Sequence, residues 1–112
     1  GTEQRQFLYA EDCCEALETV MNCYSDFKPT DPLHITSFNA TSIAEIASHI
    51  QGYFNGIRKY DVKIKPGFAK DSVQMDKRNE ADTYITGWWL PKTGISEGIG
   101  KVFEEMKKDY GY

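Results

Sequence analysis

The eight residues from Arg5 to Asp12 constrain the fold most, because they combine a cation, a short strand and a helix start. Phe7 and Tyr9 occupy alternate positions in an aromatic-rich run that favours a brief extended segment. Asp12 can accept hydrogen bonds from the free N–H groups of a new helix, and Glu15 completes a capping-box pattern three residues later. The pattern therefore predicts that Arg5 lies at the base of a strand-to-helix junction.

Two interpretations of Arg5 follow from these eight residues. A planar guanidinium with five fixed donors can clamp a phosphate or a carboxylate, which would make Arg5 a ligand-binding residue. Arginine is also mostly exposed in folded proteins, so a surface arginine in a partly solvated ion pair is the other interpretation. The residues alone leave both open.

The remainder of the chain predicts a mixed fold of the α+β type, with short strands and about four helices. Apolar residues at helical spacing predict helices near 12–23, 42–56, 77–85 and 93–110. Short apolar or alternating stretches predict strands at 33–38 and 60–65. A length of 112 residues is typical of one domain, so residues 1–112 are predicted to form a single domain.

Composition and charge exclude several classes of function. The formal charge of −4 argues against a general nucleic-acid binder, because no basic face is available to release counterions. No apolar run approaches a membrane span, and the first residues lack a signal-peptide pattern. We therefore expect no membrane partner and a cytoplasmic location.

No metal site or disulfide framework is expected. Cys13, Cys14 and Cys23 are odd in number and fall on one predicted helix, so they are expected to be buried, reduced thiols. His34 and His49 have no neighbouring nucleophile or carboxylate pattern, which favours structural or solvent roles.

The adjacent tryptophans Trp88 and Trp89 admit two interpretations. They could stack a base or a sugar. More often, one such tryptophan anchors a helix to the core while its neighbour lies partly exposed, and we favour this division, with the last helix as the anchored one.

Several of these motifs, in this order, resemble the C-terminal part of extended short-chain dehydrogenases, the NAD-dependent epimerase and dehydratase family. The matching motifs are Arg5-x-Phe7-x-Tyr9-x-x-Asp12, the Ser42-capped helix, Asp76, Gly87-Trp88, Pro91 and Glu97-Gly98-Ile99. Within the family, the stretches 52–57 and 65–66 are most similar to the GDP-fucose synthase subfamily, with heptose epimerases second.

The resemblance implies a substrate-binding lobe. In the family, the arginine that matches Arg5 contacts the diphosphate of a nucleotide sugar, and the second basic contact falls in the loop that here contains Lys70, where an arginine is common. The parent would be an epimerase, dehydratase or reductase that uses NAD or NADP, and its Rossmann half would lie upstream.

This chain is not expected to catalyse or to bind a dinucleotide by itself. It contains neither GxGxxG nor GxxxxGK[ST], the glycine-rich loops that hold nucleotide phosphates. Tyr24 and Lys28 match the family's catalytic Tyr-x-x-x-Lys spacing, but Lys28 precedes Pro29 and is therefore disfavoured in a helix. We interpret the match as coincidence and predict no catalytic residue.

The rival prediction is a stand-alone, non-enzymatic ligand-binding or oligomerisation module. A lobe without its cofactor half would also expose apolar faces, and such faces promote assembly into a homo-oligomer.

Overall fold

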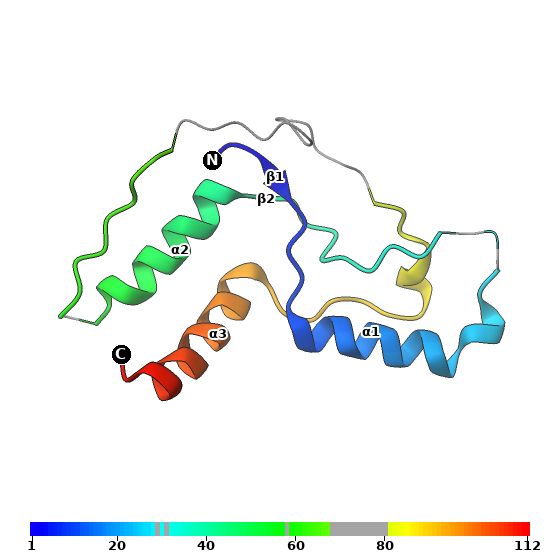
Figure 1. Cartoon of the computed structure of the whole chain (residues 1–112). Coiled ribbons are helices and arrows are strands. Elements are labelled where there is room, and N and C mark those ends of the chain that lie inside the picture. The colour runs from blue at the N-terminus through cyan, green and yellow to red at the C-terminus, as the bar shows by residue number, and fades with distance from the viewer. Residues whose placement is uncertain (29, 31, 58, 68–80) are drawn as a thin grey trace.

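A computed structural model describes residues 1–28, 30, 32–57, 59–67 and 81–112. In that part, the elements follow in the order β1 (Gln4–Arg5), α1 (Ala10–Asn22), η1 (Tyr24–Asp26), β2 (Thr41–Ser42), α2 (Ile43–Asn55), η2 (Tyr84–Gly87) and α3 (Ile95–Tyr110) (Figure 1). The mixed α and β class is confirmed. The described residues contain three α-helices rather than about four, together with one two-stranded sheet.

The sheet is a short antiparallel pair between β1 and β2. Arg5 lies opposite Thr41, and Gln4 lies opposite Ser42. The predicted extended segment around Phe7 therefore pairs slightly earlier than expected, at Gln4–Arg5. Its partner Thr41–Ser42 contains the predicted helix cap Ser42 and also forms a strand immediately before α2.

The start of α2 is tied to the N-terminal segment. The Ser42 hydroxyl accepts a hydrogen bond from the Glu45 N–H at 3.1 Å, which confirms Ser42 as the predicted N-cap. The carbonyls of Glu3 and Gly1 accept bonds from the next two helix N–H groups, those of Ile43 at 3.2 Å and Ala44 at 2.9 Å. These bonds satisfy N–H groups that the first turn of a helix leaves without intrahelical partners.

Asp12 does not cap α1, which corrects the prediction. The helix begins at Ala10 with Tyr9 as its N-cap, and Asp12 lies in the first turn with only 4% of its surface exposed. Its Oδ2 accepts the N–H groups of Lys92 at 3.1 Å and Thr93 at 2.8 Å. The carboxylate is therefore engaged by a distant loop rather than by its own helix.

The predicted strand at 33–38 is not formed. The Thr36 hydroxyl accepts the Phe38 N–H at 2.7 Å, and Phe38 adopts a positive φ of 55°. Such local bonds between side chain and backbone compete with strand pairing. The apolar side chains of Leu33, Ile35 and Phe38 nevertheless pack against the core, as the hydrophobic pattern requires.

The predicted strand at 60–65 is also absent, because side chains of α2 occupy its backbone groups. The Val62 N–H donates to Asn55 Oδ1 at 2.7 Å, and the Val62 carbonyl accepts from Gln51 Nε2 at 2.9 Å. Side chains of α2 thus take the place of a neighbouring strand. Residues 60–65 form an extended segment that belongs to no sheet.

The predicted helix at 77–85 lies partly outside the described residues. Its described end is not α-helical, because η2 is a short 3₁₀ turn that begins only at Tyr84. Asp82 Oδ1 accepts the Tyr84 N–H at 2.7 Å at this start. The last helix is confirmed, although it begins at Ile95 rather than at Thr93.

The buried core lies beside α1. Ala16 and Ile85 are fully buried and Trp89 is 5% exposed, whereas Trp88 is 36% exposed. The expected division between the two tryptophans is therefore confirmed. The anchored helix is α1 rather than the last helix, because Trp89 packs in the same cluster as Ala16 of α1. We call α1, η1, the 33–38 segment, η2 and the two tryptophans the core arm.

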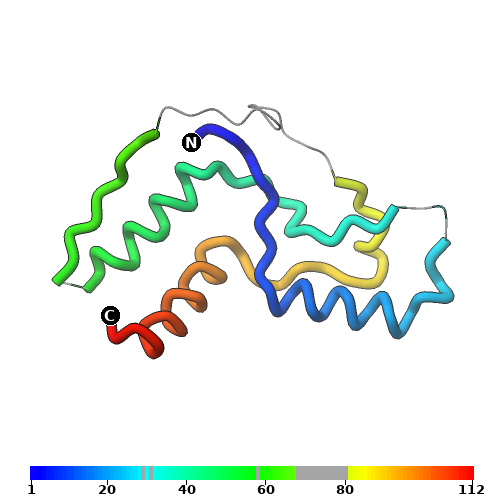
Figure 2. Tube along the Cα trace, viewed as in Figure 1, coloured from blue at the N-terminus to red at the C-terminus, as the bar shows by residue number. Residues whose placement is uncertain are grey.

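The strands β1 and β2 and the helices α2 and α3 make up a second region, which we call the groove arm. Figure 1 shows the two arms extending in different directions from the point where the chain enters α1. The N-terminus lies near the start of α2, and the C-terminus lies at the far end of α3 (Figure 2). In the part of the chain that the structure describes, no helix combines the length and apolar character needed to span a membrane.

The molecule is thin and elongated, with principal extents of 53 × 34 × 17 Å. Its radius of gyration is 17.0 Å, whereas a compact domain of this length has about 13 Å. Its accessible surface is 8245 Å², against about 6,300 Å² for a compact monomer of this mass. The chain therefore exposes far more surface than a self-contained domain of its size.

Candidate functional site

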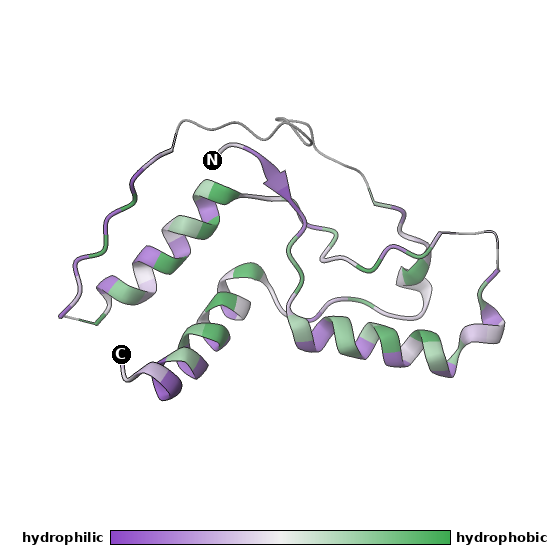
Figure 3. Ribbon diagram, viewed as in Figure 1, coloured by the Kyte–Doolittle hydropathy of each residue, from purple (hydrophilic) through white to green (hydrophobic). Residues whose placement is uncertain are grey.

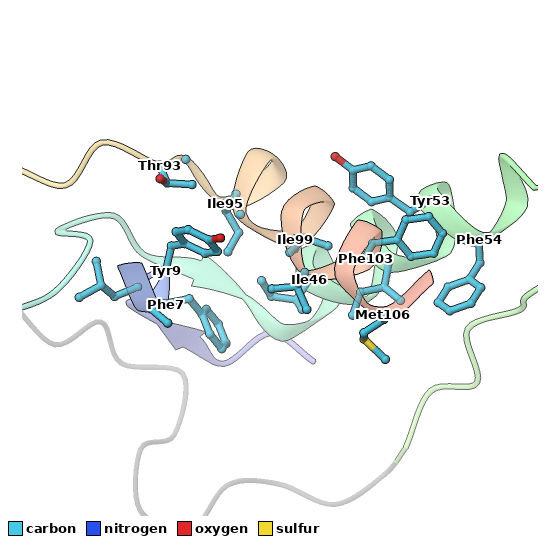
Figure 4. A pocket seen from close by; sticks show the side chains of 16 residues that line it. Phe7, Tyr9, Ile46, Tyr53, Phe54, Thr93, Ile95, Ile99, Phe103 and Met106 are labelled. Atoms are coloured by element: carbon cyan, nitrogen blue, oxygen red, sulfur yellow. The ribbon is translucent and has the colours of Figure 1, made fainter. Parts of the chain in front are cut away.

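An apolar groove of about 520 Å³ runs along the groove arm (Figure 4). Three parts of the chain form its walls: the segment that joins β1 to α1, one face of α2, and one face of α3. Its lining consists almost entirely of aliphatic and aromatic side chains together with two glycines. The lining residues are Phe7, Leu8, Tyr9, Ala10, Ile46, Ile50, Tyr53, Phe54, Thr93, Gly94, Ile95, Gly98, Ile99, Val102, Phe103 and Met106.

Aromatic contacts fix the distance between α2 and α3. Phe103 is buried, and its ring centroid lies 5.0 Å from that of Phe54 and 5.4 Å from that of Tyr53. The Tyr53 hydroxyl donates to the Ser96 carbonyl at 3.0 Å. A Cβ at Gly100 would overlap the hydroxyl end of Tyr53, so any larger residue at this position would displace the Tyr53 side chain.

The helices that line the groove are amphipathic. Figure 3 shows hydrophobic and hydrophilic residues interleaved along α2 and α3. The apolar side chains of α3 recur at Ile95, Ile99, Val102 and Met106 and line the groove. This spacing of three or four residues places them on one helical face.

A smaller polar pocket of about 170 Å³ adjoins the groove. It shares Phe7 and the 93–95 segment with the groove, and the hydroxyl and amide residues Ser37, Asn39 and Thr41 line it as well. The apolar groove and the polar pocket therefore lie side by side and share part of their lining. Such an arrangement suits a ligand or a segment that is mainly apolar with one polar group.

Asp12 holds the loop that separates the two cavities from the core arm. Besides the two hydrogen bonds that the loop N–H groups donate to Asp12, Lys92 Nζ lies 2.8 Å from Glu15 Oε1. The hydrogen bond that the Lys92 ammonium donates to Glu15, and next the negative charge of Glu15, raise the pKa of Lys92 above the ordinary lysine value. Lys92 is thus engaged by α1 at the rim of the polar pocket.

Arg5, the first predicted substrate-binding residue, lies half-buried on β1. Its Nη1 donates to the Gln4 carbonyl at 3.0 Å. The residues that line the two cavities do not include Arg5, but its strand partner Thr41 lines the polar pocket. Lys70, the second predicted contact, lies outside the described residues, as does Asp76.

The cysteine prediction is partly wrong. All three cysteines are free thiols, but Cys14 is exposed, whereas Cys13 and Cys23 are partly buried. Position 14 faces away from the core because the core face of α1 passes through Ala16. Within the described residues no group of three or more potential ligand side chains is arranged to hold a metal ion.

The Tyr24 and Lys28 pair does not form a catalytic arrangement. Tyr24 is 75% exposed in η1, and Lys28 follows the end of that short turn. The two residues do not share a helix on which the lysine could lie one turn from the tyrosine. His34 has a structural contact, as predicted, because its Nδ1 accepts the Asp82 N–H at 2.7 Å.

Sequence reasoning missed the groove. It predicted the apolar faces of both helices, and it expected a lobe without its cofactor half to expose apolar faces, but it did not predict that these faces line one groove. The number of apolar faces is the signal that could have revealed the groove. Two amphipathic helices and a few short extended segments do not cover each other on all apolar sides.

The comparisons with known proteins give one curated relative. The chain is 31% identical over 109 residues to a GDP-L-fucose synthase of Sinorhizobium fredii (strain NBRC 101917 / NGR234). The alignment covers 95% of this chain and 32% of the relative, so the chain spans about a third of that protein's length. No protein-family model matches the chain, and no solved structure matches it. The chain is therefore similar to part of a nucleotide-sugar enzyme.

Proposed function

We propose that this chain is the substrate-binding portion of a longer NAD(P)-dependent nucleotide-sugar epimerase, dehydratase or reductase. In this proposal residues 1–112 form the C-terminal portion of the parent, and a Rossmann half upstream holds NAD or NADP. The parent's chemistry is hydride transfer at the sugar. The chain described here orients the substrate and does not catalyse alone.

One observation carries the proposal: the similarity to GDP-L-fucose synthase extends over nearly all of this chain but over only a third of the relative. The elongated shape supports it, because a lobe that normally packs against another half retains apolar surface when considered alone.

The proposed substrate contact is Arg5, acting on the diphosphate. Arg5 is held on a strand whose partner residue, Thr41, lines the polar pocket. Paired guanidinium donors match phosphate oxygens in a bidentate geometry, which fixes orientation as well as binding. We propose Lys70 as the second cation, by its place in the loop where the family has a basic residue. Accurate orientation matters because a displaced substrate loses much of the proximity advantage of the reaction.

The test is the affinity of the longer parent for its nucleotide sugar, measured by calorimetry. Arg5→Ala should weaken binding by about 1.5–3 kcal/mol, the range for a charge-assisted hydrogen bond. Lys108→Ala is the matched control, because it also removes one positive charge, from an exposed site near the end of α3. Equal affinities for the parent and the Arg5 variant would exclude Arg5 from the site.

The apolar groove favours a second candidate, a stand-alone ligand-binding module. A cavity of about 520 Å³ falls within the range of small-molecule sites. The two candidates differ in what lies upstream. A reading frame that encodes a glycine-rich βαβ unit and a helical Tyr-x-x-x-Lys before Gly1 supports the enzyme, and a frame without them supports the module.

A further inference from the structure

We propose that the polar pocket beside the groove binds a hydroxyl-bearing sugar ring of the nucleotide sugar, and that the Thr41 hydroxyl forms a hydrogen bond to that ring. The inference deepens the proposed function and rests on it, because the ring belongs to the same substrate whose diphosphate Arg5 is proposed to hold. It adds a binding residue from β2 and gives the polar pocket a ligand.

The Thr41 hydroxyl is the first observation. Thr41 lines the polar pocket with only 3% of its surface exposed, and in the described part of the chain its side chain makes no hydrogen bond. Among the described residues, the polar side-chain atom that is both unpartnered and sealed from solvent is the Trp89 indole nitrogen. The Thr41 oxygen is therefore reachable from the pocket. Buried hydroxyl groups usually have a hydrogen-bond partner, and an occupant of the pocket would supply it.

The chemistry of the lining favours an uncharged, hydroxylated group. Among the described residues no carboxylate lines the pocket, and Lys92, the lysine in its lining, is ion-paired with Glu15 at 2.8 Å. The side-chain amide of Asn39 offers both donors and an acceptor to ring hydroxyls. Phe7, which is 37% exposed, offers an aromatic surface to the carbon atoms of a ring.

Backbone donors at the start of α3 complete the polar lining. Gly94 is the N-cap of α3, and it lines the pocket together with Ile95. The first N–H groups of a helix have no intrahelical acceptor, and no side chain caps them at this position. With Thr41, these donors offer several polar contacts to one ring.

The size of the pocket limits what can enter it. Its volume of about 170 Å³ equals that of about six water molecules, at about 30 Å³ each. One sugar ring is of this size, whereas a whole nucleotide sugar is much larger. The rest of the substrate would therefore lie outside the pocket.

The position of Arg5 connects the pocket to the proposed diphosphate contact. Arg5 lies directly opposite Thr41 in the antiparallel pair of β1 and β2. Directly opposite side chains project from the same face of a sheet, with Cβ atoms about 4.5–5.5 Å apart. In a nucleotide sugar the hexose and the ribose are both attached to the diphosphate, so a diphosphate held by Arg5 brings one of these rings beside Thr41.

Calorimetry on the longer parent, expressed from its complete reading frame, tests the proposal. The probe is GDP-L-fucose, the compound in the relative's name. Thr41→Val removes the hydroxyl but keeps a β-branched side chain, and it should weaken binding about three- to tenfold, the effect of losing one neutral hydrogen bond. Thr41→Ser keeps the hydroxyl and should retain most of the affinity. Thr83→Val is the matched control, because Thr83 is exposed and lines neither cavity.

The two halves of the probe, GDP and L-fucose 1-phosphate, distinguish which ring the pocket holds. A loss of affinity confined to L-fucose 1-phosphate would assign the pocket to the hexose, and a loss confined to GDP would assign it to the ribose. Losses for both halves or for neither would overturn the proposal, because one hydroxyl is proposed to contact one ring. Unchanged binding of GDP-L-fucose by the Thr41→Val variant would overturn it as well, as would an equal loss in the Thr83→Val control.

Thermal unfolding of the same variants separates a ligand contact from a structural one. Because the Thr41 hydroxyl has no partner among the described residues, Thr41→Val should not lower the unfolding midpoint of the parent. A lower midpoint together with weaker binding would assign the hydroxyl to the fold and contradict the proposal.

Failure of the proposed function would give a different result. The unsubstituted parent would then bind none of the three probes, and both proposals would fall. Binding by the unsubstituted parent with no effect of Thr41→Val would remove the pocket contact alone and leave the proposed function intact.

Discussion

The core arm and the groove arm are built from similar amphipathic helices, yet only one of them closes. In the core arm, η2 and the 33–38 segment pack on the side of α1 that carries Ala16, so that Ala16, Ile85 and Trp89 are buried, although Leu17 and Met21 elsewhere on α1 remain 51% and 74% exposed. In the groove arm, α2 and α3 contact each other through Phe103, and the rest of their apolar faces line an open groove. The number of covering segments, rather than the apolar content of a helix, therefore decides whether a core forms.

The largest expected effect tests the closed arm. Trp89→Ala removes a large side chain that is 5% exposed, and it should lower the free energy of unfolding by about 3–5 kcal/mol. Trp88→Ala, at the exposed neighbour, should cost clearly less. Urea denaturation followed by circular dichroism measures both, and equal losses would show that Trp89 is not the centre of the core.

A smaller effect is expected at the junction between the arms. Asp12→Ala leaves the N–H groups of Lys92 and Thr93 without their shared acceptor, and it should cost about 2–3 kcal/mol of stability. Asp12→Asn keeps one oxygen acceptor and should cost less. Glu11→Ala removes an exposed carboxylate from the same turn and serves as the control. If Asp12→Ala matched this control, the carboxylate would not hold the two arms together.

Within the groove arm, the next prediction concerns the N-cap of α2. Ser42→Ala removes the bond to the Glu45 N–H, and it should destabilise the chain by about 1 kcal/mol. Ser42→Thr retains the hydroxyl and should lose less. Thermal unfolding of the two variants gives the comparison, and an unchanged midpoint for Ser42→Ala would mean that the bonds accepted by the Gly1 and Glu3 carbonyls are sufficient to start α2.

The smallest effect should occur in the groove itself. Val102→Ser changes a side chain that is 46% exposed in the 112-residue chain, so the expected loss is within about 0.5 kcal/mol. A loss in the isolated chain as large as that for Trp89→Ala would show that the groove arm is already closed.

Patterns carried by side-chain type within one segment were predictable from the sequence. The Ser42 cap, the extents of α2 and α3, and the division between Trp88 and Trp89 all depend on local composition, and the structure confirms them. The groove was not predictable, because whether the apolar faces of α2 and α3 are covered depends on which other segments reach them.

Features that depend on contacts between segments distant in sequence were predicted less well. Asp12 was expected to cap its own helix but binds a loop 80 residues away in sequence. Val62 lies in an alternating run, yet Asn55 and Gln51 of α2 take its backbone bonds. The proposed site depends in addition on Lys70, which lies outside the described residues, so the clamp formed by Arg5 and Lys70 stays a prediction.

The intact mass of the natural gene product, expressed from its complete reading frame, tests most directly whether this chain is part of a longer enzyme. We expect a polypeptide roughly three times as long as this chain, since the chain covers 32% of the GDP-L-fucose synthase that it resembles. A product of 12.8 kDa, the mass of these 112 residues, would leave no room for a cofactor half. That result would contradict the proposed enzyme and favour the stand-alone module.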